Sequence, residues 1–126
     1  MAYPQHLRYT KDHEWIKMES GNIAVVGITQ FAQQELGDIV YVEVETVGER
    51  LDADAVFGTV EAVKTVSDLY LPVSGKILSL NPALAGSPDL VNSDPYEAGW
   101  MIKLEVDNPA DIEKLMDAGA YESTIA

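Results

Sequence analysis

Short segments that alternate between hydrophobic and polar residues dominate this chain. Within residues 39–45, Val40, Val42 and Val44 alternate with one tyrosine and two glutamates, so the three valines should share one face of a strand. Similar short apolar segments, separated by Gly, Pro, Asn and Asp, occur at residues 23–28, 55–63, 66–71, 75–80 and 100–106. Many short strands of this kind are typical of an all-β sandwich or barrel.

Two segments depart from this alternation and predict helices. The segment 30–36 follows Thr29, a good N-cap residue, and is followed by a glycine that can end the helix. The second begins at Asn108, another cap residue, with proline at the first helical position and Ile112, Leu115 and Met116 along one stripe. We therefore expect a short internal helix and a C-terminal helix over about residues 109–118.

Length and composition indicate one domain over residues 1–126, because 47% hydrophobic residues in a chain of this size can form a core. The net charge of -13 disfavours binding to nucleic acid or to anionic membranes and favours basic partners. No apolar run approaches the length of a membrane span. The first residues do not resemble a targeting peptide, so a cytoplasmic bacterial protein is the simplest expectation.

The candidate chemistry centres on Lys64. The chain has no cysteine, so any redox chemistry must come from an attached group. Lys64 lies near the tip of a predicted hairpin over about residues 56–77, where a mobile side chain can be reached and acylated by another enzyme. Composition and spacing alone favour an ordinary exposed hairpin lysine and cannot reject it. In an enzyme, Lys64 would be a Schiff-base nucleophile with Glu61 as proton acceptor, which requires a desolvated lysine.

Other candidate residues favour structural roles. His6 and His13 have no acidic or histidine neighbours at ligand spacing, so we expect no metal site. Trp15 and Trp100 could contact a ligand, but large aromatic residues in small β domains more often belong to the core.

Longer motifs add a family resemblance. Residues 58–68, GTVEAVKTVSD, resemble the lipoyl-attachment motif of glycine cleavage H proteins. Five further blocks resemble signatures of the same family in the same order: residues 9–15, 26–33, 36–40, 72–77 and 92–101. The resemblance therefore covers nearly the whole chain.

This resemblance implies a mainly β, sandwich-like barrel, the barrel-sandwich hybrid of lipoyl and biotinyl carriers. It also implies three groups of functional residues: Lys64 for covalent attachment of lipoate, Glu61, Gly48 and Gly75 for recognition by lipoylating enzymes, and Glu14 and Asp68 for a cleft that receives the loaded arm. For the two glycines, turn geometry with positive φ is an equally good explanation. Carboxylates near the arm would stabilise its cationic aminomethyl group.

The function implied by the resemblance is that of a non-catalytic lipoyl carrier in the glycine cleavage system. Its partners would be the glycine decarboxylase (P protein), the aminomethyltransferase (T protein), dihydrolipoyl dehydrogenase (L protein) and the lipoylating enzymes. An alternative within the family is a lipoyl donor or relay protein for other lipoate-dependent complexes. Biotin carriers usually have Met-Lys-Met at the turn and lipoyl domains of 2-oxo acid dehydrogenases usually have Asp-Lys-Ala, so Val63-Lys64-Thr65 fits neither class well.

Overall fold

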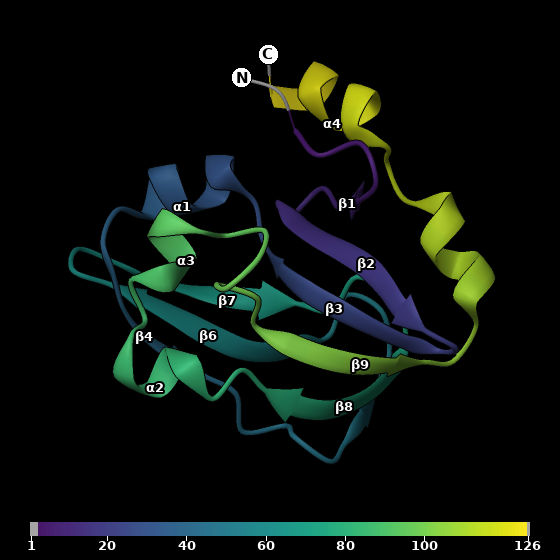
Figure 1. Cartoon of the computed structure of the whole chain (residues 1–126), viewed down its shortest axis with the longest axis horizontal. Coiled ribbons are helices and arrows are strands. Elements are labelled where there is room, and N and C mark those ends of the chain that lie inside the picture. Colours follow the sequence, from purple (N-terminus) through teal and green to yellow (C-terminus); the bar gives the residue numbers. More distant parts are fainter. Residues whose placement is uncertain (1–2, 126) are drawn as a thin grey trace.

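The computed structural model describes residues 3–125, which form two antiparallel sheets packed face to face (Figure 1). The larger sheet has the strand order β1 (Arg8–Tyr9), β2 (Glu14–Ser20), β3 (Ile23–Ile28), β9 (Ile102–Val106), β8 (Gly75–Leu80) and β5 (Arg50–Leu51). The smaller sheet has the order β4 (Ile39–Glu43), β6 (Val56–Ala62) and β7 (Val66–Tyr70). The expected mainly β sandwich is confirmed.

Alternation along the strands divides the apolar residues between two clusters. The main core lies between the sheets and includes Ile16, Val60, Ile77 and Leu104, each almost fully buried. A second, aromatic cluster packs on the other face of β2 and β3, under the C-terminal helix; its buried members are Tyr3, Leu7, Tyr9, Trp15, Val25, Ala118 and Tyr121. The N-terminal segment and the C-terminal helix therefore cover a sheet face that would otherwise be exposed.

The predicted internal helix is confirmed as α1 (Gln30–Leu36). Its N-cap, Thr29, accepts a hydrogen bond from Ala32 N–H at 3.2 Å, and Gly37 ends the helix with a positive φ of 84°. Two further short helices, α2 (Ala83–Gly86) and α3 (Leu90–Ser93), lie at the same end of the sandwich as α1 (Figure 1). Within residues 3–125, no helix is long and apolar enough to cross a membrane.

The expected C-terminal helix over about residues 109–118 is wrong in its extent. Asn108 caps a short 3₁₀ helix over Pro109–Lys114, and a separate helix, α4 (Ala118–Ile125), follows. The interruption has a tertiary cause, because Met116 forms a β-bridge with Tyr9 and the two residues exchange backbone hydrogen bonds of 2.8 and 3.1 Å. This pairing with β1 prevents the chain from continuing as one helix.

The expected alternation of valines in residues 39–45 is also only partly right. A register shift between Ile39 and Tyr41, where β4 pairs with β6, places Val40 on the surface together with Tyr41. Val42 is buried as expected, and the strand ends at Glu43. The bulge therefore exposes Val40 beside the exposed Tyr41, at the end of the sheet that carries Lys64.

Replacing Leu104, which is fully buried in the centre of the main core, by Ala should lower the free energy of unfolding by about 2–5 kcal/mol through lost burial and a residual cavity. Urea unfolding followed by circular dichroism measures this change. The matched control, Val47→Ala at a 44% exposed loop position, should shift the free energy by less than about 0.5 kcal/mol. Equal losses in both variants would contradict the placement of the core.

Candidate functional site

Lys64 lies at the exposed tip of the hairpin formed by β6 and β7. The two strands pair with Glu61 opposite Val66, and Ala62 N–H donates to the Thr65 carbonyl over 2.7 Å across the turn. The side chain of Lys64 is exposed. The structure thus confirms the expected position of this lysine on a tight hairpin turn.

The backbone at the hairpin tip is hydrogen-bonded to the loop between α1 and β4. Val63 N–H donates to the carbonyl of Asp38 over 3.0 Å. The loop that carries Asp38 is held in turn by Asn92, whose side chain donates to the Gly37 carbonyl at 2.9 Å and accepts from Ile39 N–H at 2.8 Å. Fixed backbone beneath a mobile side chain suits a residue that other enzymes must find and modify.

The aliphatic part of Lys64 lies over Gly37, the residue that ends α1. A Cβ atom at position 37 would be 3.4 Å from Cε of the lysine and 3.8 Å from its Nζ. Leu36, the neighbour of this glycine, lines a cleft between α1 and the smaller sheet. The lysine therefore lies beside that cleft.

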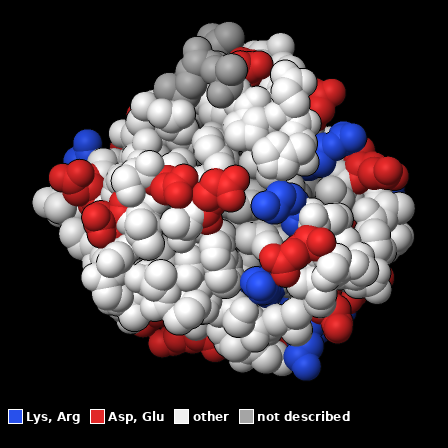
Figure 2. All heavy atoms as spheres, viewed as in Figure 1, with Lys and Arg blue, Asp and Glu red and all other residues white. Residues whose placement is uncertain are grey.

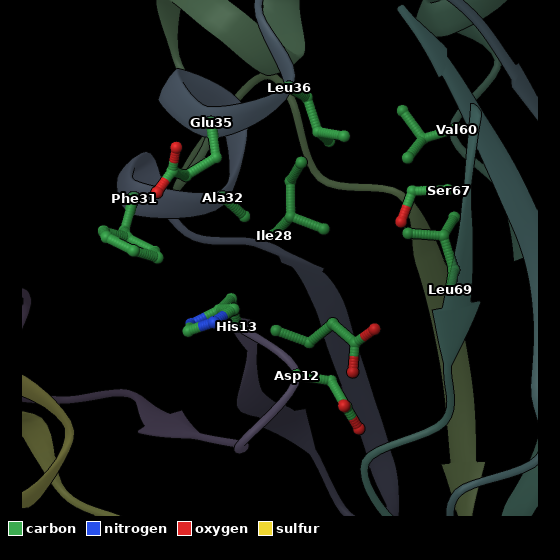
Figure 3. Close-up of a pocket in the computed structure, with 11 residues that line it drawn as sticks. Asp12, His13, Ile28, Phe31, Ala32, Glu35, Leu36, Val60, Ser67 and Leu69 are labelled. Atoms are coloured by element: carbon green, nitrogen blue, oxygen red, sulfur yellow. The ribbon is translucent and has the colours of Figure 1, made fainter. Parts of the chain in front are cut away.

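The cleft has a volume of about 480 Å³, within the ~300–1,000 Å³ typical of ligand pockets. Figure 3 shows residues of α1 along one side and residues of β6 and β7 along the other, with Asp12 and His13 at a third. Its apolar lining consists of Ile28, Phe31, Ala32, Leu36, Val60 and Leu69. Its polar lining consists of Asp12, His13, Glu14, Glu35 and Ser67. The cleft is thus apolar with an acidic rim.

Glu14 is the buried acid of this cleft, with only 2% of the residue exposed. One carboxylate oxygen accepts from Tyr70 N–H at 2.8 Å, and the other accepts from the Thr10 hydroxyl at 3.3 Å. Burial raises the pKa of Glu14 to about 8, because desolvation penalises the charged form more than these two hydrogen bonds favour it. A cation entering the cleft would shift this balance toward the carboxylate.

His13 forms another wall of the cleft, and it is held by a residue that sequence reasoning missed. The hydroxyl of Tyr121 lies 2.8 Å from Nδ1 of His13 and 2.8 Å from the hydroxyl of Thr29, the N-cap of α1. Its ring stacks on Tyr9 with centroids 4.8 Å apart. Burial lowers the pKa of His13. The C-terminal helix α4 thus connects two walls of the cleft through one hydroxyl.

The expectation that Asp68 faces the cleft needs correction. Ser67 and Leu69 line the cleft, and because neighbouring strand residues point to opposite faces, Asp68 lies exposed on the outer face of the smaller sheet. Of the two acids expected in the cleft, only Glu14 is there.

The three residues expected to guide lipoylation lie in two places. Glu61 is exposed on β6, three residues before Lys64. Gly48 and Gly75 lie at the base of the hairpin, which is about 20 Å from the tip for strands of this length. Gly48 has a φ of 93°, whereas Gly75 is needed because a Cβ there would overlap the carbonyl of Glu105 in β9. Turn geometry thus accounts for Gly48, and close strand packing for Gly75.

The remaining candidate residues have structural surroundings. Trp15 is completely buried and donates from its indole N–H to the Pro95 carbonyl at 3.0 Å, whereas Trp100 is half-buried beside the aromatic cluster. His6 is exposed. In the part of the chain that the structure describes, no group of three or more His, Asp or Glu side chains is arranged to hold a metal ion.

Charge is distributed unevenly around these features. On the face shown in Figure 2, most Lys and Arg side chains lie over β2, β3 and β9, whereas the region of α1 and α3 carries mainly Asp and Glu. On this face, the region around α1 and α3 is therefore mainly acidic, which favours cationic groups there.

Comparisons with known proteins agree with this arrangement. The family model described as glycine cleavage H-protein matches residues 7–126. The glycine cleavage system H protein of Chlorobium limicola is 56% identical over 126 residues, covering 99% of this chain and 98% of that protein. The chain belongs to the glycine cleavage H-protein family. The corresponding protein of Bacteroides fragilis is 53% identical over 125 residues, with 99% and 98% covered. The crystal structure of the H protein from Mycobacterium marinum matches with a TM-score of 0.87 at 38% identity, covering 98% of each chain.

Membership in this family makes the chain a lipoyl carrier of the glycine cleavage system, a non-catalytic subunit that works with the P, T and L proteins. H proteins carry their lipoyl group on a lysine. The residues present here suit such a group, because an exposed lysine lies beside a largely apolar cleft that contains one buried carboxyl group.

The buried acid makes stability depend on pH. Because the folded-state pKa of Glu14, about 8, exceeds its ordinary value of 4.5, the folded protein holds this proton more tightly than the unfolded chain does. This stabilisation is complete below about pH 4.5 and is lost as the pH rises through 8. Relative to Glu14→Gln, the wild type should therefore lose about 2–4 kcal/mol between pH 5 and pH 9, measured by urea unfolding. The control Glu35→Gln changes an exposed acid of the cleft rim but keeps Glu14, so it should retain the pH-dependent loss of stability. A flat difference between wild type and Glu14→Gln would contradict the burial of a titrating carboxyl.

The contribution of the Tyr121 hydroxyl to stability can be measured separately from that of its ring. Tyr121→Phe keeps the ring stacked on Tyr9 but removes the partner of His13 and Thr29, so the melting temperature should fall by an amount equivalent to about 1–2 kcal/mol. The ¹⁵N shifts of the His13 imidazole should change at the same time. Tyr41→Phe, at a half-exposed position, is the control and should change neither quantity. Unchanged His13 shifts in Tyr121→Phe would show that the hydroxyl does not hold this side chain.

Proposed function

We propose that Lys64 is the residue that carries the lipoyl group of this protein. The observation that supports this assignment is an exposed amine on an anchored hairpin tip, with its stem lying beside the cleft. Lys11, Lys103 and Lys114, in contrast, are each held in ion pairs with acidic side chains. A flexible arm on a fixed turn can be presented to several active sites in succession.

When bound, the lipoyl group would supply the redox-active disulfide on which the glycine decarboxylase, the aminomethyltransferase and dihydrolipoyl dehydrogenase act. The part that this chain contributes is to bind, orient and protect. The apolar side chains of the cleft, including Phe31, Leu36 and Leu69, would exclude water from whatever the lysine carries into it.

The charge of the cleft fits a cationic load. Glu14 is the buried carboxyl, and Asp12 and Glu35 lie at the more accessible rim. An amine cation seated beside Glu14 would favour its carboxylate form and donate a charge-assisted hydrogen bond to it. The backbone N–H of Tyr70, which already donates to this carboxyl group, would hold it in position.

Modification of Lys64 requires lipoylating enzymes, and Glu61 is the recognition residue closest to the lysine along β6. Gly48 and Gly75 would act at a distance, by setting the geometry at the base of the hairpin. We place the protein in the bacterial cytoplasm because the relatives named above come from bacteria. Its net charge of -13 argues against nucleic acid or anionic membranes as partners.

Lys64→Arg tests this assignment, because arginine keeps the charge and the exposed position but cannot be acylated by the same chemistry. Intact mass and peptide mapping after incubation with lipoate, ATP and a lipoate ligase should show one lipoyl group on wild-type Lys64 and none on the variant. Lys76→Arg, a matched change of an exposed strand lysine, should be lipoylated normally. A lipoyl group on any other lysine, or wild-type protein that the ligase leaves bare, would refute the assignment.

A further inference from the structure

The outer face of the smaller sheet presents an ordered surface next to Lys64. Strand register places Tyr41, Glu61 and Val66 directly beside one another across β4, β6 and β7. Tyr41 is 50% exposed and Val66 is 59% exposed, although both are large apolar residues. Val40, exposed by the bulge in β4, and Val63, in the turn itself, extend this apolar surface around the lysine.

A second row behind the first is acidic. Glu43, Thr59 and Asp68 lie beside one another in the next outward-facing positions of the same three strands, and the two acids are exposed. Together with Glu61, this face carries three carboxylates, and none of them forms an ion pair within residues 3–125. The surface therefore consists of an apolar margin at the lysine and an unpaired acidic row behind it, which we call the hairpin face.

We infer that the hairpin face is the docking surface for the enzyme that acylates Lys64, and that this enzyme presents an apolar contact bordered by Lys or Arg side chains. The inference rests on the proposed role of Lys64. Unpaired carboxylates on an exposed face are complementary to a cationic partner, and exposed apolar groups gathered beside a modification site mark a contact.

The length of the side chain at position 64 distinguishes the acylating enzyme from the enzymes that use the finished carrier. Before acylation, the amine stands only one lysine side chain away from the turn, and that side chain lies against Gly37. An active site that captures the amine must therefore come into contact with the residues beside it, Val63 and Val66. Enzymes that use the finished carrier meet a much longer arm and can act without covering the tip. The hairpin face should accordingly matter for making the carrier more than for using it.

The test uses two pairs of variants of the full chain. Val63→Thr with Val66→Thr removes apolar contact while keeping β-branched shape, and Val56→Thr makes the same change at an exposed position at the other end of the hairpin. Glu43→Gln with Asp68→Asn removes two charges from the face; Glu105→Gln with Glu113→Gln removes two exposed charges elsewhere. The measured quantity is kcat/KM for lipoylation of the unmodified protein by a lipoate ligase with ATP and lipoate, at low and high salt.

We expect Val63→Thr with Val66→Thr to lower kcat/KM for lipoylation about tenfold. Glu43→Gln with Asp68→Asn should lower kcat/KM at low salt and make it less dependent on salt concentration. The melting temperatures of both variants should stay unchanged. Both controls should stay within about twofold of wild type. After complete lipoylation, all four proteins should support glycine decarboxylation and aminomethyl transfer like the wild type.

Three results would overturn the inference. The first is equal lipoylation of the variants of the hairpin face and of the controls. The second is normal lipoylation of the hairpin-face variants but slower use of the loaded carrier by the decarboxylase or transferase, and the third is a wild-type dimer in sedimentation velocity that the hairpin-face variants abolish. The second result would assign the face to a different enzyme and the third to a second copy of this chain. Wild-type protein that is not lipoylated at Lys64 would instead refute the proposed function itself, so the two failures are distinguishable.

Discussion

One backbone hydrogen bond, from Val63 N–H to the Asp38 carbonyl, joins the hairpin tip to the rest of the protein. Without it, the turn would be held only by the pairing of β6 with β4 and β7, which ends at Ala62 on the β4 side. Asn92 strengthens this connection from the other side, because its amide group also donates to Gln33 of α1 at 2.9 Å. The position of Lys64 thus depends on a chain of contacts from α3, through the end of α1, to the turn.

The same end of the molecule combines two opposing requirements. An arm that several enzymes use has to be accessible, whereas a reactive load has to be shielded from water. The fold meets both by placing the lysine outside and a largely apolar cleft beside it, with Glu14 buried at one wall. Burying a carboxyl group costs stability whenever it ionises, and a structural protein would gain by replacing it. Its presence in the cleft supports a role in binding a cation.

Sequence patterns predicted the local features of this site well. Thr29, the α1 segment and the lysine hairpin follow from capping and alternation, which act over a few residues. The features that were missed depend on contacts between distant parts of the chain. Met116 leaves its helical stripe to pair with Tyr9, and Tyr121 reaches His13 from 108 residues away. No local pattern encodes such contacts.

Strand register explains the other differences. The bulge at Val40 decides which side chains of β4 face the core, and the alternation along β7 points Ser67 and Leu69 into the cleft. A shift of one residue in register would move every side chain of a strand to the opposite face. Asp68, expected in the cleft from its motif, lies on the outer face for this reason. The sequence thus predicted that Lys64 lies on an exposed hairpin turn, as the structure shows, but the direction in which its acidic neighbours point required the structure.

The most direct test of the central claim, that the load on Lys64 seats in the cleft, is a comparison of ¹H–¹⁵N spectra of the lipoylated carrier before and after loading with aminomethyl by the decarboxylase. If the load seats there, the largest amide shifts will lie along the cleft, at Phe31, Leu36 and Leu69, and at Tyr70, whose N–H donates to Glu14. Shifts confined to residues 63–66 of the turn would mean that the loaded arm remains in solvent, and would contradict the claim.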